Sequence, residues 1–137
     1  MTGLVVCGVV LAMASVYGVL QRRRSGRIRV RGRDGEKRLG AAELGEGLGE
    51  RATLVQFSSA FCAPCRATRR VLAEVAGMVP GVAHVEIDAE GHLDLVRRLG
   101  ILKTPTVLVL DADGRIVRRA TGQPRKTDVI AALGEAV

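Results

Sequence analysis

Two cysteines three positions apart are the residues in this sequence best suited to chemistry. Cys62 and Cys65 enclose Ala63 and Pro64, directly after a stretch of alternating, β-favouring residues. Side chains three apart share one face of a helix, so the two sulfurs lie close enough to form a disulfide. The N–H groups at a helix start stabilise a thiolate, which lowers the pKa of a cysteine there below its free value of about 8.5. Pro64 suits the first helical turn, where its missing N–H would have no partner. The spacing predicts thiol–disulfide chemistry.

A strand and a helix are expected to position these cysteines. Residues 53–58 alternate in the manner of a strand, and residues 62–78 carry apolar side chains at helical spacing. Pro80 and Gly81 follow and end the helical pattern. The cysteine pair therefore lies where a strand leads into a long helix.

The rest of the chain alternates in kind, which predicts an α/β domain. Further elements are expected as a Gly-interrupted helix at 41–48, a strand at 82–88, a helix at 92–99, strands at 106–110 and 115–121, and a last helix at 124–136. The run at 106–110 is apolar throughout, which is typical of a central strand covered on both faces. The Asp-Ala-Asp-Gly turn at 111–114 is of the hairpin kind and makes the strand after it antiparallel.

The N-terminal stretch favours a membrane anchor. Residues 3–20 carry no charge, and as a helix they would span about 27 Å, close to a hydrocarbon thickness of about 30 Å. A buried core helix or a cleaved signal peptide are the alternatives, but the positive charges follow the apolar run instead of preceding it. Those charges predict that residues 22–137 lie in the cytoplasm, the alternative being an extracytoplasmic domain. The expected organisation is a transmembrane helix at 1–21, a basic juxtamembrane linker at 22–38 and one domain at 39–137.

The excess positive charge of the chain is confined to the linker. The net charge is +7, and residues 22–38 hold nine basic against two acidic side chains, whereas residues 39–137 hold twelve of each. A domain that binds nucleic acid would not be electrically balanced in this way, so no nucleic-acid partner is expected. The basic residues favour contact with anionic lipid, and the alternation at 27–31 also permits a short edge strand.

The remaining candidate ligands do not predict a metal site. A four-thiolate zinc site needs a second cysteine pair, and Cys7 lies alone in the apolar run. The simplest interpretation of Cys7 is a small apolar residue, and palmitoylation or a disulfide between two spans of a dimer are the alternatives. His84 and His92 are isolated, and we interpret them as solvent-facing or locally hydrogen-bonded. Neither a metal nor an organic cofactor is expected.

Two motifs in a fixed order carry a family resemblance over about residues 36–137. The first is the string Phe-Cys-Ala-Pro-Cys-Arg at 61–66, which follows a strand. The second is Gly-Ile-Leu-Lys-Thr-Pro-Thr at 100–106, which precedes the apolar strand and the Asp-x-Asp-Gly turn. Together they resemble the thioredoxin family, which implies a thioredoxin-like fold with a central mixed β-sheet flanked by helices.

The resemblance implies a role for each motif residue. Cys62 would be the exposed nucleophile that attacks a substrate disulfide, and Cys65 the buried thiol that resolves the mixed disulfide. Pro105 would follow a cis peptide bond, so that the backbone of Thr104 receives a substrate strand, and Phe61 would supply an apolar wall. The implied partners are protein disulfides or dithiols, with an electron donor that the sequence does not identify.

Two positions depart from the family pattern. Gln56 stands where thioredoxins usually carry a buried aspartate, and His84 stands where a lysine often pairs with that aspartate. A carboxylate would raise the pKa of the resolving thiol and could move its proton, and a glutamine can do neither. With Pro64 and Gln56 as supporting residues, we expect a slower or more specialised reductant than a general thioredoxin.

The leading functional hypothesis is a membrane-anchored thiol–disulfide oxidoreductase that exchanges protein disulfides through its Cys-Ala-Pro-Cys dithiol. In the cytoplasm it would act as a reductant in redox homeostasis. Outside, it would resemble tethered proteins of cytochrome or envelope-protein maturation. The alternative is a redox-inactive thioredoxin-fold adaptor that tethers a partner at the membrane. A basic lipid- or nucleic-acid-binding peptide with a passive domain is a third.

Overall fold

The domain is built on a five-stranded mixed β-sheet with the strand order β1-β5-β4-β2-β3. The structure is a computed structural model, and it describes residues 1–24, 28–29 and 37–137. The strands are β1 (Ile28–Arg29), β2 (Ala52–Ser58), β3 (Val82–Asp88), β4 (Thr106–Asp111) and β5 (Ile116–Thr121). The expected α/β class and the central position of β4 are confirmed.

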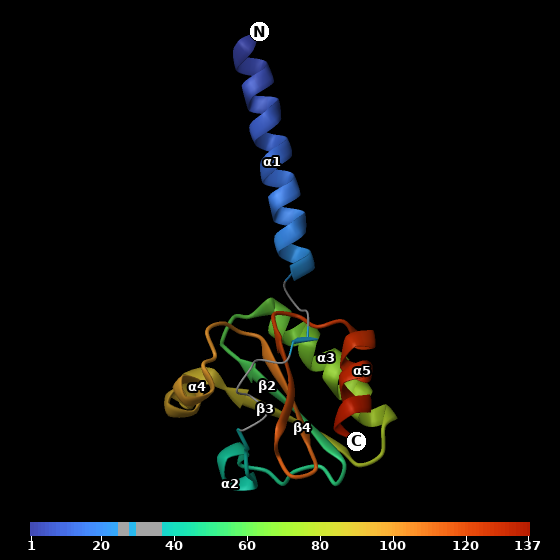
Figure 1. The fold of residues 1–137 in the computed structure, drawn as a ribbon. Helices are drawn as coiled ribbons and strands as arrows, with labels where there is room; N and C mark the ends of the chain where they lie inside the picture. Colours follow the sequence, from blue (N-terminus) through green and yellow to red (C-terminus); the bar gives the residue numbers. More distant parts are fainter. Residues whose placement is uncertain (25–27, 30–36) are drawn as a thin grey trace.

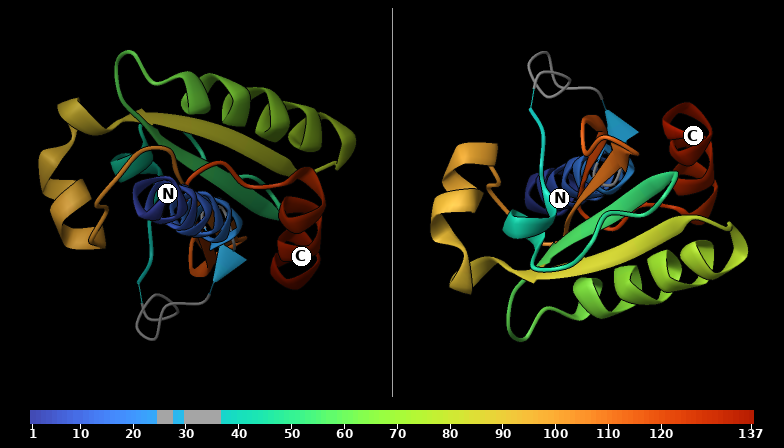
Figure 2. Two further views of the ribbon diagram at one scale, coloured as in Figure 1. Left: turned by 90° about the horizontal axis from the view of Figure 1, so that it is seen from above. Right: turned by 90° about the horizontal axis from the view of Figure 1, so that it is seen from below.

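Helices cover both faces of this sheet (Figures 1 and 2). The covering helices are α2 (Ala41–Leu44), α3 (Ala63–Met78), α4 (Leu93–Leu99) and α5 (Lys126–Ala136), with a 3₁₀ turn at Ala89–Gly91. Helix α1 (Thr2–Arg24) precedes them and does not cover the sheet. Helices α3 and α5 pack on one face, whereas α2 and α4 contribute to the core of the other. The result is a three-layer arrangement with the sheet in the middle.

The strand directions place the C-terminal ends of β2 and β5 and the N-terminal end of β4 at the same end of the sheet. β2 is parallel to β3 and antiparallel to β4, and β4 is antiparallel to β5. The β4–β5 turn is closed by Asp111, whose carboxylate accepts the N–H groups of Asp113 and Arg115. Gly114 takes the left-handed conformation there, with φ of 82°. The predicted hairpin is confirmed.

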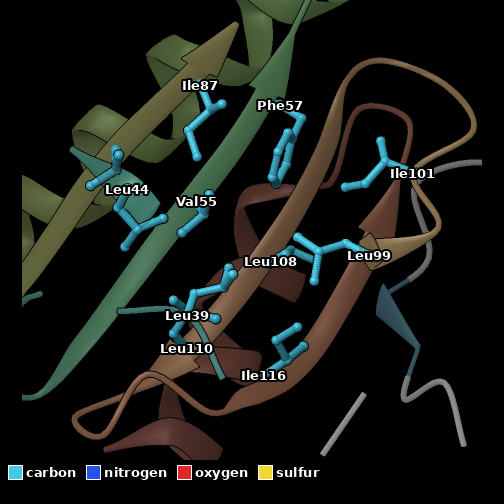
Figure 3. Packing of buried hydrophobic residues seen from close by; sticks show 11 residues of the cluster. Leu39, Leu44, Val55, Phe57, Ile87, Leu99, Ile101, Leu108, Leu110 and Ile116 are labelled. Atoms are coloured by element: carbon cyan, nitrogen blue, oxygen red, sulfur yellow. The ribbon is translucent and has the colours of Figure 1, made fainter. Parts of the chain in front are cut away.

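The alternation of side chains along β2 divides the core in two. Val55 and Phe57 point to the face of α2 and α4, where they pack with Leu108, as Figure 3 shows. Ala52 and Leu54 point to the opposite face, in the cluster that contains Leu72 of α3. Phe57 is the one aromatic side chain in these described clusters, so the core is aliphatic, as its composition implies.

Helix α2 is shorter than its predicted range of 41–48. It ends at Leu44 because Gly45 adopts the left-handed conformation, with φ of 72°. Helix α3 begins at Ala63, one residue later than predicted, because Cys62 is its N-cap. The last helix begins at Lys126 instead of residue 124, since Arg125 is the extended N-cap.

The edge strand permitted by the alternation at 27–31 exists in its described part. Ile28 and Arg29 form β1, which pairs antiparallel with β5 at the outer edge of the sheet. Residues 27, 30 and 31 lie outside the described residues.

Helix α1 projects away from the sheet and is exposed along its length (Figure 1). Its span Thr2–Arg23 is long and apolar enough to cross a membrane, the one such helix in the described chain. Cys7 lies exposed on it as a free thiol. The helix is therefore a candidate anchor for the domain.

Candidate active site

The two motif cysteines are joined at the N-terminus of α3. Their sulfurs are 2.14 Å apart and their Cα atoms 5.2 Å apart, as a disulfide requires. Cys62 is the N-cap and half-buried, whereas Cys65 lies in the first turn and is only 2% exposed. This difference in exposure lets an outside group approach Cys62 but not Cys65.

The first turn of α3 is arranged to stabilise charge on Cys62. The backbone N–H of Cys65 donates to the Sγ of Cys62 across 3.2 Å. Thr68 fixes the same turn, because its hydroxyl donates to the carbonyl of Pro64 at 2.8 Å. An N–H and a helix dipole aimed at a sulfur favour its thiolate form once the disulfide is reduced.

A second loop completes the site. The Thr104–Pro105 peptide bond is cis, as the resemblance implied. The hydroxyls of Ser59 and Thr104 are 2.7 Å apart, which joins this loop to the one that precedes Cys62. The N–H of Gly122 donates to the carbonyl of Pro105 at 2.8 Å.

Arg119 anchors the start of this second loop. It lies in β5 and is 6% exposed, and its Nη2 donates to the carbonyl of Leu99 at 2.7 Å. A cation at the C-terminal end of α4 also interacts favourably with the helix dipole. The loop that carries Thr104 is thereby fixed to the sheet at its beginning.

Gln56, in β2, is fully buried and is hydrogen-bonded to the backbone of Cys65. Its Nε2 donates to the carbonyl of Cys65 at 2.8 Å and to the hydroxyl of Ser58 at 2.9 Å. Its Oε1 lies 3.2 Å from Nε2 of His84. Because the Cys65 carbonyl only accepts, the amide orientation is fixed, and His84 must donate from Nε2. The position that could hold a buried carboxylate is therefore a neutral amide with all its groups paired.

His84 lies half-buried beside a surface ion pair. Burial lowers its pKa, with opposing effects from Glu86, which raises the pKa, and Arg69, which lowers it. Arg69 and Glu86 form a two-pronged ion pair of 2.6 and 2.7 Å. The local hydrogen bond confirms the interpretation of His84 as a satisfied group. His92 likewise contacts the carbonyl of Asp88 through Nδ1 at 2.9 Å.

The two loops of the site each carry an exposed apolar side chain. Phe61, directly before Cys62, is fully exposed and has a φ of 57°, in the left-handed region that bulky residues avoid. Leu102, on the second loop, is 89% exposed. The backbone of Phe61 is therefore strained, and its apolar ring is presented to solvent next to Cys62 in the sequence.

The predicted site residues thus come together at one end of the sheet. Ser58, Ser59 and Arg119 were not anticipated as part of it. The two serines follow a strand in the sequence, but their spacing does not say which loop they contact. Arg119 reads as a solvent-facing strand residue, and only the packing of α4 reveals its burial.

Comparisons with known proteins agree with this geometry. The family described as Thioredoxin matches residues 42–135. Thioredoxin of Mycolicibacterium smegmatis is 30% identical over 87 residues, which cover 61% of this chain and 77% of that protein. Thioredoxin of Alicyclobacillus acidocaldarius is 31% identical over 88 residues, or 64% and 83% of the two chains. The solved N21Q mutant thioredoxin of Halobacterium salinarum superimposes with a TM-score of 0.58 at 21% identity, over 64% of this chain and 75% of its own.

Proposed function

Because this chain belongs to the thioredoxin family and is a thiol–disulfide oxidoreductase, we propose that it exchanges disulfides with protein substrates while α1 anchors it in a membrane. The observation that carries the proposal is the disulfide between half-exposed Cys62 and buried Cys65 at a helix N-terminus. A pair so placed reacts with outside disulfides through one sulfur and closes internally through the other.

The exchange balances without a cofactor. The Cys62 thiolate attacks one sulfur of a substrate disulfide, the substrate S–S bond breaks, and the departing thiolate takes up a proton. Cys65 then loses its proton and attacks the Sγ of Cys62, which releases the second substrate thiol. The substrate gains two electrons and two protons, and Cys62–Cys65 becomes the disulfide. A substrate dithiol drives the same steps in reverse.

The second loop is proposed to hold the substrate during this exchange. The backbone of Thr104, set by the cis bond to Pro105, would pair with the substrate backbone, and Phe61 would contact the apolar side chains of the substrate. Support comes from the bond between Ser59 and Thr104, which places the loop beside the segment leading to Cys62.

Gln56 is proposed to slow proton transfer at Cys65. Its amide fixes the Cys65 carbonyl but has no proton to exchange near neutral pH. Gln56→Asp supplies a titratable group, so it should raise the rate of insulin-disulfide reduction. A wild-type rate at the level of a general thioredoxin, unimproved by this change, would contradict the assignment.

Membrane anchorage in the cytoplasmic orientation rests on the charges that follow α1. Arg22, Arg23 and Arg24 lie at its C-terminal end, and Lys/Arg-rich flanks stay in the cytoplasm. Alkaline phosphatase fused after Val137 should therefore be inactive, and a fluorescent cytoplasmic reporter at the same point should be bright. Active phosphatase with a dark reporter would place the domain outside.

Trapping tests the enzymatic step. The full chain with Cys65→Ser should accumulate mixed disulfides with protein partners through Cys62, because the resolving thiol is absent. The double variant with Cys62→Ser as well should form none. An absence of reduction-sensitive adducts in the single variant would instead favour a redox-inactive adaptor.

A further inference from the structure

The point at which the chain enters the sheet fixes which end of the domain lies nearest α1. β1 pairs with β5 so that Ile28 lies opposite Ala120, and Ala120 lies opposite Val107 of β4. The next row of the sheet holds Thr106 and Thr121. The first residue of β1 is therefore one row from the residue that follows Pro105, and the chain enters at the active-site end.

The arrangement of the elements agrees with this register. In Figure 1, α1 leaves the domain from the end of the sheet where the β2–α3 loop and the loop before β4 lie. Three strand spacings of about 4.8 Å, or about 14 Å in all, separate β1 from β2, the strand that leads to Cys62. The hairpin at Asp111 lies at the opposite end.

The joint between anchor and sheet is short. α1 ends at Arg24 and β1 begins at Ile28, so four Cα steps span at most about 14 Å even if fully extended. At 1.5 Å per residue, α1 is about 35 Å long and crosses a hydrocarbon layer of about 30 Å with little to spare. The start of β1, at the active-site end of the sheet, then stays within about 14 Å of the end of α1, and the end of β2 lies at most about 28 Å from it.

The short distance between the active-site end and the membrane limits the size of the substrates that can reach the cysteines. A folded protein of about 100 residues has a radius of gyration of about 13 Å, which corresponds to a diameter of about 34 Å, so it is wider than the space between the active-site end and the lipid headgroups. A short segment at the end of a transmembrane helix has no such obstacle. Phe61 and Leu102, at 105% and 89% exposed, are the most exposed large apolar side chains of the described domain, and they lie in the β2–α3 loop and the loop before β4, both at this end.

We infer that the preferred substrates are disulfides or dithiols in the membrane-proximal segments of integral membrane proteins in the same bilayer. The inference rests on the proposed function and specifies its substrate class. Confinement to one membrane raises the effective concentration of such partners. Their cysteines exchange with Cys62 and Cys65 by the steps given above, with no further reactant.

The test uses the reduced full chain in vesicles of phosphatidylcholine and phosphatidylglycerol, in a single turnover that needs no electron donor. Two single-span reporter peptides carry the same disulfide-closed loop. One holds it directly outside the span, and the other holds it on a helical spacer of about 40 residues, about 60 Å further out. Alkylation gel shifts follow the oxidation of Cys62–Cys65. The near reporter should react at least about tenfold faster than the far reporter.

A lengthened joint provides the matched variant. A Gly/Ser insert of about 30 residues between Ser25 and Gly26 adds about 30 Å of flexible reach, and should bring the two rates to within about threefold of each other. The same insert placed after Val137 should leave the preference intact. Equal rates for both reporters with the natural joint, or a preference that survives the lengthened joint, would overturn the inference.

A soluble disulfide distinguishes a failure of the proposed exchange activity from a failure of the proposed substrate class. Every version of the chain should reduce oxidised glutathione at the same rate, because that molecule enters the gap. Failure of the natural chain to exchange with glutathione in either direction, the reduced chain with oxidised glutathione or the oxidised chain with reduced glutathione, would refute the proposed function itself. Reduction of glutathione without any preference between the reporters would refute only the membrane-proximal substrate class.

Discussion

Replacement of Gln56 by leucine should destabilise the domain well beyond a loss of one hydrogen bond. The amide donates to the carbonyl of Cys65 and to the hydroxyl of Ser58, and both partners are buried. Each buried bond contributes about 1–1.5 kcal/mol, so Gln56→Leu should cost about 2–3 kcal/mol. The bond from His84 adds little, because that half-buried ring can turn to water instead.

The measurement is urea unfolding of the oxidised full chain in detergent micelles, followed by far-UV circular dichroism. With a slope typical of a small domain, the unfolding midpoint should fall by about 1–2 M without a change in slope. A change in slope would indicate that the unfolded state, and not the native bonding, had been altered.

Thr68→Val is the matched control. Thr68 is also fully buried in contact with the first turn of α3, but it gives up only the bond to the Pro64 carbonyl. Valine has nearly the same shape, so this variant should lose about 1 kcal/mol. If Gln56→Leu costs no more than Thr68→Val, the amide does not support the cysteines in the way described.

Four further substitutions probe other parts of the structure. Burial lowers the pKa of His84 in the folded chain, so the unfolded chain binds a proton at this residue more readily. The contribution of neutral His84 to the free energy of unfolding is therefore fully present above about pH 6.5, and it is lost as the pH falls through the folded pKa. His84→Gln keeps a donor for Gln56 and should flatten this decline in a pH series of unfolding midpoints. Gly114→Ala should cost more than about 1 kcal/mol in urea unfolding, because φ is +82° and a Cβ would lie 2.2 Å from the carbonyl oxygen of Leu39. Gly134→Ala, with open space around the new methyl group in α5, should instead add about 0.5 kcal/mol, and the opposite order would contradict this reasoning. Phe61→Asn should leave stability within about 0.5 kcal/mol, since the side chain is fully exposed and asparagine tolerates the left-handed backbone. It should slow insulin-disulfide exchange severalfold but not exchange with glutathione, and equal effects on both would exclude a substrate contact.

The fold could be predicted wherever local signals marked both ends of an element. β3 has the predicted bounds, because Gly81 precedes it and Asp88 caps the turn that follows. The helix at 41–48 was overestimated because its apolar residues continue past Gly45, and side-chain pattern alone does not show that a glycine will adopt the left-handed conformation.

The sequence predicted which residues form the candidate site, but not the hydrogen bonds and strand pairings that hold them together. The motif located Cys62, Cys65 and the cis bond before Pro105. The bond between Ser59 and Thr104 joins residues 45 positions apart, and no periodicity relates them. The pairing of β1 with β5 is equally nonlocal, because the sequence of an edge strand does not indicate which strand it will pair with.

The pairing of the first strand with the last also orders the events of synthesis. Ile28 leaves the ribosome about 90 residues before its partner Ala120, a delay of roughly 5–20 s at usual elongation rates. During that time β2 and β3 can already associate, whereas the β1 segment has nothing to bind. The arginines around it oppose unwanted association with other chains meanwhile. Helix α1 is therefore made first and attached to the sheet last, so its position at the active-site end is set only after the rest of the domain has formed.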